Sequence, residues 1–206
     1  LLGTQNELVQ KIHETGVPTI VVLVGGRPLS VNWIAQNVQA LVQAWEPGSL
    51  GGRALANILT GKVNPSAKLP ISIPRHSGQI QMIYNHKPSQ YFHKYIDGPS
   101  TPLYPFGFGL SYTRFAYSSL KLSHTRISDK DSFTASIELT NVGDREGTEV
   151  VQLYIRDIYS SATRPVKELK DFARVTLKPG EKKTVTFTVT PDKLAYLNRN
   201  MQYGVE

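Results

Sequence analysis

Carboxylates are scarce in the first half of the chain, which limits the acid–base chemistry available there. Residues 1–114 hold nine lysines and arginines but only four acidic side chains: Glu7, Glu14, Glu46 and Asp97. Glu7 completes a Thr-x-x-Glu capping box at the start of an expected helix, and Glu14 lies at the end of that helix. Catalysis is therefore conceivable only at Glu46 and Asp97.

Neither of these two carboxylates has a convincing catalytic setting. Glu46 follows an expected strand, and ligands bind at the carboxyl ends of strands in open α/β sheets. A role as an acid/base is thus one interpretation, but a turn glutamate next to Pro47 is the simpler one, which we favour. Asp97 is followed by Gly98, which is an ordinary turn signal. We therefore assign no catalytic residue to this chain.

Histidines and serines, which could support metal or nucleophilic chemistry, are present, but their sequence context does not fit such sites. His86 and His93 share one loop, without a ligand-spaced carboxylate or a helix to hold them, so surface or seam packing is favoured. Ser66 and Ser111 lack the strand-to-helix turn of a nucleophilic serine. The chain has no cysteine, which excludes thiolate sites and a disulfide scaffold. We predict no metal and no cofactor.

Charge and hydropathy argue against two further classes of partner, of which nucleic acid is a weak alternative. The net charge is +7, but the basic residues of the first half are scattered singly rather than clustered as on a nucleic-acid surface. No apolar run approaches the length of a transmembrane helix. Neither nucleic acid nor a membrane is an expected partner. The chain begins at Leu1 almost directly on a helix, which we interpret as the start of a fragment.

Apolar segments divide residues 1–75 into alternating helices and strands. In order, they are a helix ending at Gly16, a strand at 19–24, a helical stretch through Trp33 and Val38, a strand at 40–45, and a helix from Gly51 to Gly61. This alternation predicts parallel strands joined by crossover helices. The strand at 19–24 is continuously apolar, which is typical of a strand covered on both faces.

From Phe115 onward the apolar pattern alternates with a period of two. The clearest strands are residues 133–140, 151–156 and 184–189, separated by turn signals. Several such strands predict a β-sandwich. The chain stops after Tyr203-Gly204, where a further strand would begin, so we expect the sandwich to lack its last strand.

An aromatic and glycine-rich stretch, residues 102–112, separates the two halves. Its aromatic residues are Tyr104, Phe106, Phe108 and Tyr112. We expect these rings to pack in the seam between two domains, with Gly107 and Gly109 allowing close approach. The preceding residues, 76–101, are predicted to form a long irregular connection, which is usually functional or ordered by a partner domain.

Several motifs resemble the C-terminal part of a glycoside hydrolase family 3 β-glycosidase, over essentially the whole chain. Those resembling the end of its α/β sandwich domain are Leu2-Gly3-Thr4-Gln5, Gly26-Arg27-Pro28-Leu29, Trp45-x-Pro47-Gly48 with Gly51-Gly52, and Asn64-Pro65-Ser66-x-Lys68-Leu69-Pro70. The stretch that resembles the family's junction between the two domains is Tyr104-Pro105-Phe106-Gly107-Phe108-Gly109-Leu110-Ser111-Tyr112. Those resembling its fibronectin type III-like domain are Thr140-Asn141-x-Gly143, Gly147-x-Glu149-Val150-Val151-Gln152-Leu153-Tyr154 and Arg164-Pro165-x-Lys167-Glu168-Leu169.

This resemblance implies an α/β fold followed by an all-β fold. Residues 1–75 are then the end of the α/β sandwich domain, 76–114 the connection and junction, and 115–206 the fibronectin type III-like sandwich. Three residues depart from the family's usual pattern: Ala67 in place of glycine, Glu46 in place of an aromatic residue, and Leu2 in place of proline.

The resemblance also implies a function. The family hydrolyses terminal β-linked glucosyl or xylosyl residues with retention, using a nucleophilic aspartate in an N-terminal barrel domain and an acid/base glutamate, both expected to lie outside this chain. A β-glycoside substrate, that barrel domain and a periplasmic or secreted location follow by implication. Trp45, Arg27 and Tyr84 are the expected sugar-pocket residues, because sugars stack on aromatic rings and accept charged hydrogen bonds; plain core packing is an open alternative for Trp45.

A non-catalytic carbohydrate-binding module, or a spacer or adhesion module, is the alternative function. It requires a row of exposed aromatic residues on one face of the sandwich, whereas the wet faces of the predicted strands carry mostly Thr, Ser, Lys and Glu. By itself, the chain is expected to present an incomplete parallel sheet with uncovered apolar surface. It should therefore bind its missing domain, self-associate or aggregate.

Overall fold

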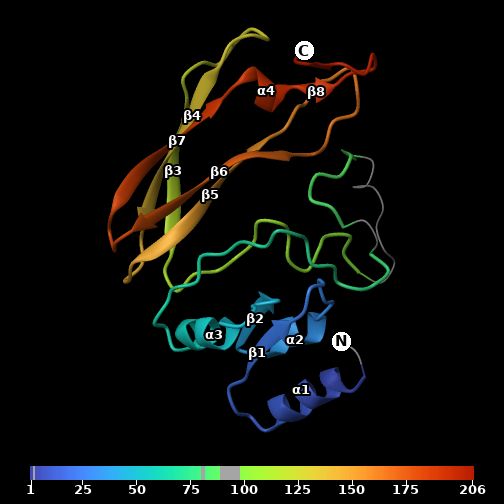
Figure 1. Ribbon diagram of the computed structural model, residues 1–206, viewed down its shortest axis with the longest axis vertical. Helices are drawn as coiled ribbons and strands as arrows, with labels where there is room; N and C mark the ends of the chain where they lie inside the picture. Colours follow the sequence, from blue (N-terminus) through green and yellow to red (C-terminus); the bar gives the residue numbers. More distant parts are fainter. Residues whose placement is uncertain (2, 80–81, 89–97) are drawn as a thin grey trace. The chain divides into compact units, whose positions relative to one another are not determined.

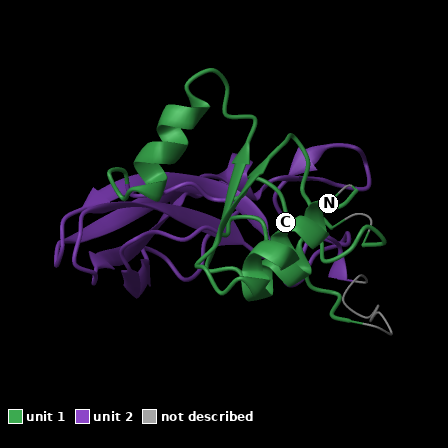
Figure 2. Ribbon diagram, turned by 90° about the horizontal axis from the view of Figure 1, so that it is seen from below, with its two compact units in different colours: residues 1–63, 69–84, 94–108 green, residues 64–68, 85–93, 109–206 purple. Residues whose placement is uncertain are grey.

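The computed structural model describes residues 1, 3–79, 82–88 and 98–206 (Figure 1). Leu2, His93 and Asp97, which were considered above, lie outside the described residues. The chain divides into two compact units, which Figure 2 shows in different colours. Unit 1 comprises residues 1–63, 69–84 and 94–108, and unit 2 comprises residues 64–68, 85–93 and 109–206.

Unit 1 contains three helices and two strands within its described residues. They are α1 (Gln5–Glu14), β1 (Ile20–Val24), α2 (Asn32–Asn37), β2 (Ala40–Trp45) and α3 (Gly51–Leu59). β1 and β2 pair in parallel, with Ile20 opposite Ala40, and α2 forms the connection between them. This arrangement confirms the predicted parallel strands with a crossover helix.

The start of α1 differs from the sequence prediction. Thr4 precedes the helix, but its side chain makes no capping hydrogen bond. Its backbone angles are φ −88° and ψ 11°, whereas a capping residue normally has the extended backbone that aims its side chain at the helix amides. The predicted capping box is therefore wrong. The helix instead begins with a backbone bond, from the Leu8 amide to the Thr4 carbonyl, of 2.9 Å.

The core of unit 1 is small, and much of its apolar surface is uncovered. Leu23, Val31 and Ile34 form its buried centre. Ile20 and Val24, at the two ends of β1, are 51% and 62% exposed. The prediction that this strand is covered along its whole length is therefore wrong, because a two-stranded sheet has too few neighbours to cover it. The expected uncovered apolar surface is confirmed.

Unit 2 is a β-sandwich, as predicted. Its elements are β3 (Phe115–Leu122), β4 (Phe133–Asn141), β5 (Gly147–Ile155), β6 (Glu168–Leu177), β7 (Lys182–Val189), α4 (Pro191–Leu194), β8 (Tyr196–Leu197) and β9 (Tyr203–Gly204). One antiparallel sheet has the order β3-β4-β7, and β5 pairs antiparallel with β6 in the other. β8 and β9 form a separate hairpin (Figure 1).

Alternating side chains from the two sheets meet in the core of this sandwich. Leu139 from β4 and Phe187 from β7 pack with Val151 from β5 and Leu177 from β6, and each is at most 7% exposed. Along β7, the residues that alternate with these core side chains are exposed, which is the burial pattern that a period of two predicts.

The segment 64–68 belongs to unit 2 although it is distant from it in sequence. The Asn64 side-chain oxygen accepts hydrogen bonds from the Ser111 hydroxyl at 2.9 Å and the Tyr112 amide at 2.8 Å, and its nitrogen donates to the Glu146 carbonyl at 3.0 Å. A Cβ atom on Gly109 would lie 2.2 Å from the Ala67 carbonyl oxygen. Only glycine fits there, which confirms the close approach predicted for Gly109.

Tyr117, which is hydrogen-bonded to the buried Glu149, makes the stability of this unit depend on pH. The Tyr117 hydroxyl donates to Glu149 Oε1 at 3.1 Å. Burial, then the charge of Glu149 and this hydrogen bond, raise the pKa of Tyr117 above its ordinary value of 10.0. Above about pH 10 the unfolded chain ionises this tyrosine while the folded chain keeps its proton, so stability falls as pH rises.

We therefore expect Tyr117→Phe to flatten the loss of stability above about pH 10. The free energy of unfolding of unit 2 should be measured by hydrogen exchange in urea at several pH values between about 8 and 11. Tyr159→Phe, which changes a tyrosine that is 91% exposed, is the matched control and should leave the slope unaltered. Parallel pH profiles for the wild type and Tyr117→Phe would contradict this account.

Candidate functional site

The carboxyl ends of β1 and β2 lie side by side in unit 1, as parallel pairing requires. Val24 is the partner of Trp45, and the Gly25 amide donates to the Trp45 carbonyl at 2.9 Å. The two following turns, at Gly26-Arg27 and at Glu46, therefore leave the same edge of the sheet. Open α/β sheets bind ligands at this edge.

Trp45 has an unusual backbone conformation at this edge. Its φ is +52°, in the left-handed region that bulky residues rarely adopt. The strand register shifts between Leu23 and Val24, directly opposite it. Holding a tryptophan in this conformation costs about 1–3 kcal/mol, and such strain clusters at functional sites. The half-buried ring of Trp45 is thus the first structural indication of a binding site here.

Glu46 lies against the turn that follows β1. A Cβ atom on Gly26 would be 2.9 Å from Glu46 Oε1, so the absence of a side chain at Gly26 makes room for this carboxylate. Glu46 itself is exposed. It can accept hydrogen bonds from the hydroxyl groups of a ligand at this edge.

The three residues predicted to contact a sugar are placed differently from one another. Arg27 follows β1 and is exposed, so it lies at the same sheet edge as Trp45. Tyr84 stacks on Phe106, with ring centroids 4.1 Å apart and planes at 14°. The structure therefore brings Arg27 and Trp45 to one edge and places Tyr84 in an aromatic pair of unit 1.

Two buried amide side chains of unit 1 were missed by the sequence analysis. Asn32, at the start of α2, donates to the Arg75 carbonyl at 2.6 Å, but its Oδ1 is buried without a hydrogen-bond partner among the described residues. Gln43 Nε2, in β2, is likewise buried without a hydrogen-bond partner among the described residues. A buried unpaired amide costs about 1–3 kcal/mol. The only sequence signal was the polar Gln43 within an otherwise apolar strand.

Of the two histidines considered above, the structure describes His86, whose backbone and ring each lie within hydrogen-bond distance of a backbone group. The His86 carbonyl accepts a hydrogen bond from the Val166 amide at 3.0 Å, and its Nδ1 lies 2.9 Å from the Lys87 carbonyl. In the part of the chain that the structure describes, His, Cys, Asp and Glu form no group of three that could hold a metal ion. None of its helices combines the length and hydropathy needed to span a bilayer.

Comparison with known families decides how this arrangement is to be classified. Residues 1–112 match the glycosyl hydrolase family 3 C-terminal domain, and residues 149–206 match a fibronectin type III-like domain. The chain belongs to glycosyl hydrolase family 3. The resemblance and the fold class predicted from the sequence, α/β followed by a fibronectin type III-like sandwich, are thereby confirmed.

Relatives within family 3 are similar along the whole chain. It is 48% identical to a β-xylosidase of Formosa agariphila, with 100% of this chain and 29% of that protein aligned. It is 44% identical to a periplasmic β-glucosidase of Salmonella typhimurium, with 98% of this chain and 28% of that protein aligned. The chain therefore spans less than a third of the length of these relatives.

Solved structures give the same result. A β-glucosidase from Erythrobacter marinus matches 100% of this chain and 27% of its own, with a TM-score of 0.97 and 45% identity. A β-glucosidase from Listeria innocua in complex with glucose matches 98% of this chain and 29% of its own, with a TM-score of 0.91 and 38% identity. At these sequence identities, the solved structures support the same fold and the same family as the family models do.

Proposed function

We propose that this chain is the C-terminal part of a retaining β-glycosidase that removes terminal β-D-glucosyl or β-xylosyl residues. The observation that carries the proposal is similarity along the whole chain to enzymes named β-xylosidase and β-glucosidase, each more than three times as long as the aligned segment. This similarity to glycosidases favours an enzyme over the alternative of a binding, spacer or adhesion module.

The chain contributes scaffold and pocket wall rather than the catalytic carboxylates. Retention requires two carboxylates about 5 Å apart, one as nucleophile and one as acid/base. At the β1–β2 edge the described residues offer the single exposed carboxylate of Glu46. The nucleophile and the acid/base accordingly belong to other parts of the protein, including an N-terminal barrel domain, which is the partner we assign to this chain.

The pocket wall is assigned to Trp45, Arg27 and Tyr84. The ring of Trp45 offers a flat apolar surface for a sugar, and the guanidinium of Arg27 offers charged donors for its hydroxyl groups. Tyr84 presents a hydroxyl from an aromatic ring that Phe106 holds in place. Because one relative is periplasmic, we assign the protein to the periplasm or the extracellular space.

The domain boundaries proposed for the protein are those expected from the sequence. Residues 1–75 end the α/β sandwich domain, residues 76–114 form the connection and junction, and residues 115–206 form the fibronectin type III-like domain. Limited proteolysis with mass spectrometry tests them, since cleavage should concentrate in 76–114 and leave 115–206 protected. Early cleavage within β4 or β5 would contradict these boundaries.

Hydrolysis of aryl β-glucosides and aryl β-xylosides tests the proposed function. We expect no turnover by the 206-residue chain and turnover by the full-length protein. Turnover by the 206-residue chain that is lost in Glu46→Gln would move the acid/base into this chain. The absence of turnover by the full-length protein on both substrates would overturn the proposal.

We predict that Trp45→Ala lowers kcat/KM of the full-length enzyme by about tenfold, or about 1.4 kcal/mol of transition-state stabilisation, because a stacking surface for the sugar is lost. Trp45→Phe should recover most of the activity, since it keeps an aromatic face. The measurement is steady-state kinetics on aryl glycosides together with the free energy of unfolding. If Trp45→Ala destabilises unit 1 without changing kcat/KM, the ring serves core packing alone.

A further inference from the structure

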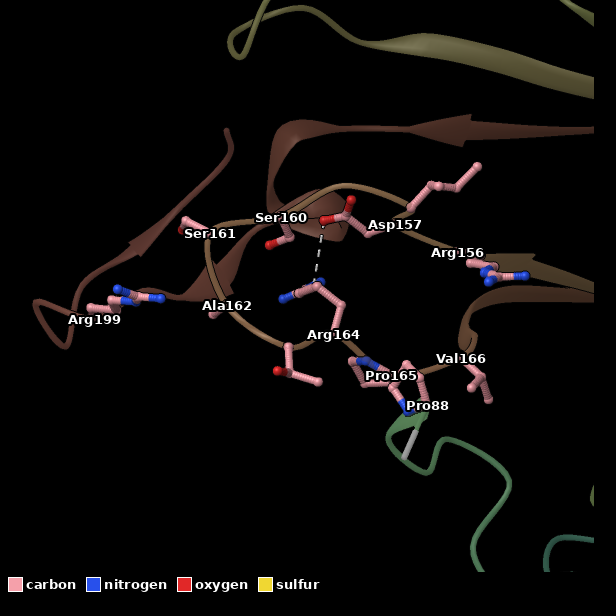
Figure 3. Close-up of a pocket in the computed structure, with 12 residues that line it drawn as sticks. Pro88, Arg156, Asp157, Ser160, Ser161, Ala162, Arg164, Pro165, Val166 and Arg199 are labelled. Atoms are coloured by element: carbon pink, nitrogen blue, oxygen red, sulfur yellow. Dashed lines mark ion pairs between the residues drawn. The ribbon is translucent and has the colours of Figure 1, made fainter. Parts of the chain in front are cut away.

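The pocket in Figure 3 lies in unit 2, beside the connection from β5 to β6, and has a volume of about 290 Å³. Arg164, one of its lining residues, is held by other side chains of the same unit. Its Nη2 donates to Glu168 at 2.9 Å, its Nε lies 3.6 Å from an Asp157 carboxylate oxygen, and its guanidinium lies 4.4 Å from the centre of the Tyr196 ring. Because these contacts belong to the fold of unit 2, we assign no ligand to this pocket.

Unit 1 contains a short antiparallel ladder, made by residues 69–73 and 103–108. Ile73 and Tyr104 form a β-bridge at its centre. Its backbone hydrogen bonds, all of 2.8 Å, run from the amides of Leu69, Ile73, Leu103 and Gly107 to the carbonyls of Phe108, Tyr104, Ile73 and Leu69, respectively. The ladder therefore joins the segment before the long connection to the segment after it.

The core of unit 1 holds this ladder in place. Leu103 packs against the buried centre formed by residues of β1, of α2 and of the turn between them. Close to the end of the ladder, the Asn32 side chain donates to the Arg75 carbonyl at 2.6 Å, and α2 begins at Asn32. The ladder is therefore fixed to β1 and α2, the two elements that flank the turn carrying Arg27.

The ladder in turn fixes Phe106, and Phe106 fixes Tyr84. The Phe106 amide donates to the hydroxyl oxygen of Ser72, a residue that is only 5% exposed. The half-buried rings of Phe106 and Tyr84 are stacked, with centroids 4.1 Å apart and planes at 14°. Because the Tyr84 ring lies flat on the Phe106 ring, this contact sets the plane in which the Tyr84 hydroxyl points.

We propose that Phe106 is a positioning residue for sugar binding, which acts by holding the Tyr84 hydroxyl toward the substrate sugar. This inference rests on the proposed function, in which Tyr84 belongs to the pocket wall, and it adds a residue that does not itself contact the sugar. A tyrosine ring without this support would adopt other orientations, and ordering it on binding would weaken the affinity for the sugar. Stacking on a ring that the core already holds removes that cost.

Steady-state kinetics of the full-length protein on aryl β-glucosides and aryl β-xylosides test this role. Phe106→Leu stays apolar but loses the flat ring, so we expect KM to rise about fivefold while kcat stays within about twofold. Phe106→Tyr keeps the ring and should restore KM. The matched control is Phe108→Leu, because Phe108 stacks on Tyr104 in the same ladder, with centroids 5.1 Å apart and planes at 25°. It should leave KM unchanged.

A double-variant cycle distinguishes positioning from a merely structural role. Tyr84→Phe keeps the stacked ring and removes the hydroxyl, so it should also raise KM about fivefold. If Phe106 acts through that hydroxyl, Tyr84→Phe/Phe106→Leu should show about the same fivefold increase rather than the product of the two increases. Ser72→Ala leaves both rings unchanged but removes the acceptor of the Phe106 amide, and it should raise KM about twofold.

The outcomes separate this inference from the proposed function. The positioning role is overturned, and the proposed function stands, if the wild type hydrolyses the substrates but neither Phe106→Leu nor Ser72→Ala raises KM. The same conclusion follows if the increases for Tyr84→Phe and Phe106→Leu multiply, or if Phe108→Leu raises KM as much as Phe106→Leu does. The absence of hydrolysis by the wild type on both substrates overturns the proposed function and this inference with it.

Discussion

Asn141→Ala should destabilise unit 2 by about 4 kcal/mol or more, since it removes four hydrogen bonds from a fully buried site. The residue is 0% exposed. Its Oδ1 accepts from the Thr113 hydroxyl at 2.7 Å and the Gly143 amide at 3.1 Å. Its Nδ2 donates to the carbonyls of Arg145 at 2.8 Å and Leu177 at 2.9 Å. Each partner left unpaired in the interior costs about 1–3 kcal/mol.

These partners explain why the effect should extend through the sandwich. Asn141 ends β4 and Leu177 ends β6, so one side chain joins the ends of both sheets. Gly143 has no room for a side chain, because its Cβ would lie 2.1 Å from the Thr113 hydroxyl oxygen. The loss of Asn141 therefore leaves a space in this turn that a side chain at position 143 cannot fill.

Hydrogen exchange of the amides in β4 and β6 measures this effect. Both tryptophans, Trp33 and Trp45, lie in unit 1, so tryptophan fluorescence follows that unit and serves as an internal reference. Asn200→Ala, at an exposed asparagine, is the matched control and should stay within about 0.5 kcal/mol of the wild type. A loss below about 1 kcal/mol for Asn141→Ala would contradict the role assigned to its network.

Lys68→Met should destabilise unit 2 by about 3–5 kcal/mol, because it leaves a buried carboxylate without its cation. Lys68 Nζ lies 2.9 Å from Glu149 Oε1 and donates to the Gly109 carbonyl at 3.0 Å. The two side chains are only 17% and 10% exposed. Without Lys68, the Tyr117 hydroxyl is the remaining side-chain donor to Glu149 among the described residues.

The double variant Lys68→Met/Glu149→Gln distinguishes the effect of the unpaired Glu149 charge from the effect of losing the Lys68 contact. It should be more stable than Lys68→Met alone, because no uncompensated charge remains in the interior. Lys182→Met breaks an ion pair with Glu138 whose side chains are 62% and 36% exposed, and it should cost less than about 1 kcal/mol. Lys68→Met and Lys182→Met could instead cause equal losses of stability, measured by hydrogen exchange of the β5 amides. That result would show that burial does not determine the strength of the Lys68–Glu149 pair.

The candidate site could be located from the sequence only in part. Alternating helices and apolar strands predicted that the residues after 24 and 45 share one sheet edge, which is the position where Arg27 and Trp45 lie. The left-handed backbone of Trp45 and the buried amides of Asn32 and Gln43 could not be predicted. These properties depend on which atoms surround a residue rather than on its neighbours in sequence.

The capping box shows how a local motif fails. The residue types at Thr4 and Glu7 fit the pattern, but the bond also needs an extended backbone at Thr4, and that backbone is bent. A motif specifies which atoms are available. It does not specify the dihedral angles that bring them together.

Apolar periodicity by itself determined the two fold classes, the parallel pairing of β1 with β2 and the sandwich of unit 2, because burial of one face or stripe imposes a period on any sequence. Only the tertiary structure decided that Lys68 is held by Glu149, which lies 81 residues further along the chain, and that Asn141 joins β4 to β6. Partners so distant leave no local signal, since their approach is set by how the whole chain packs.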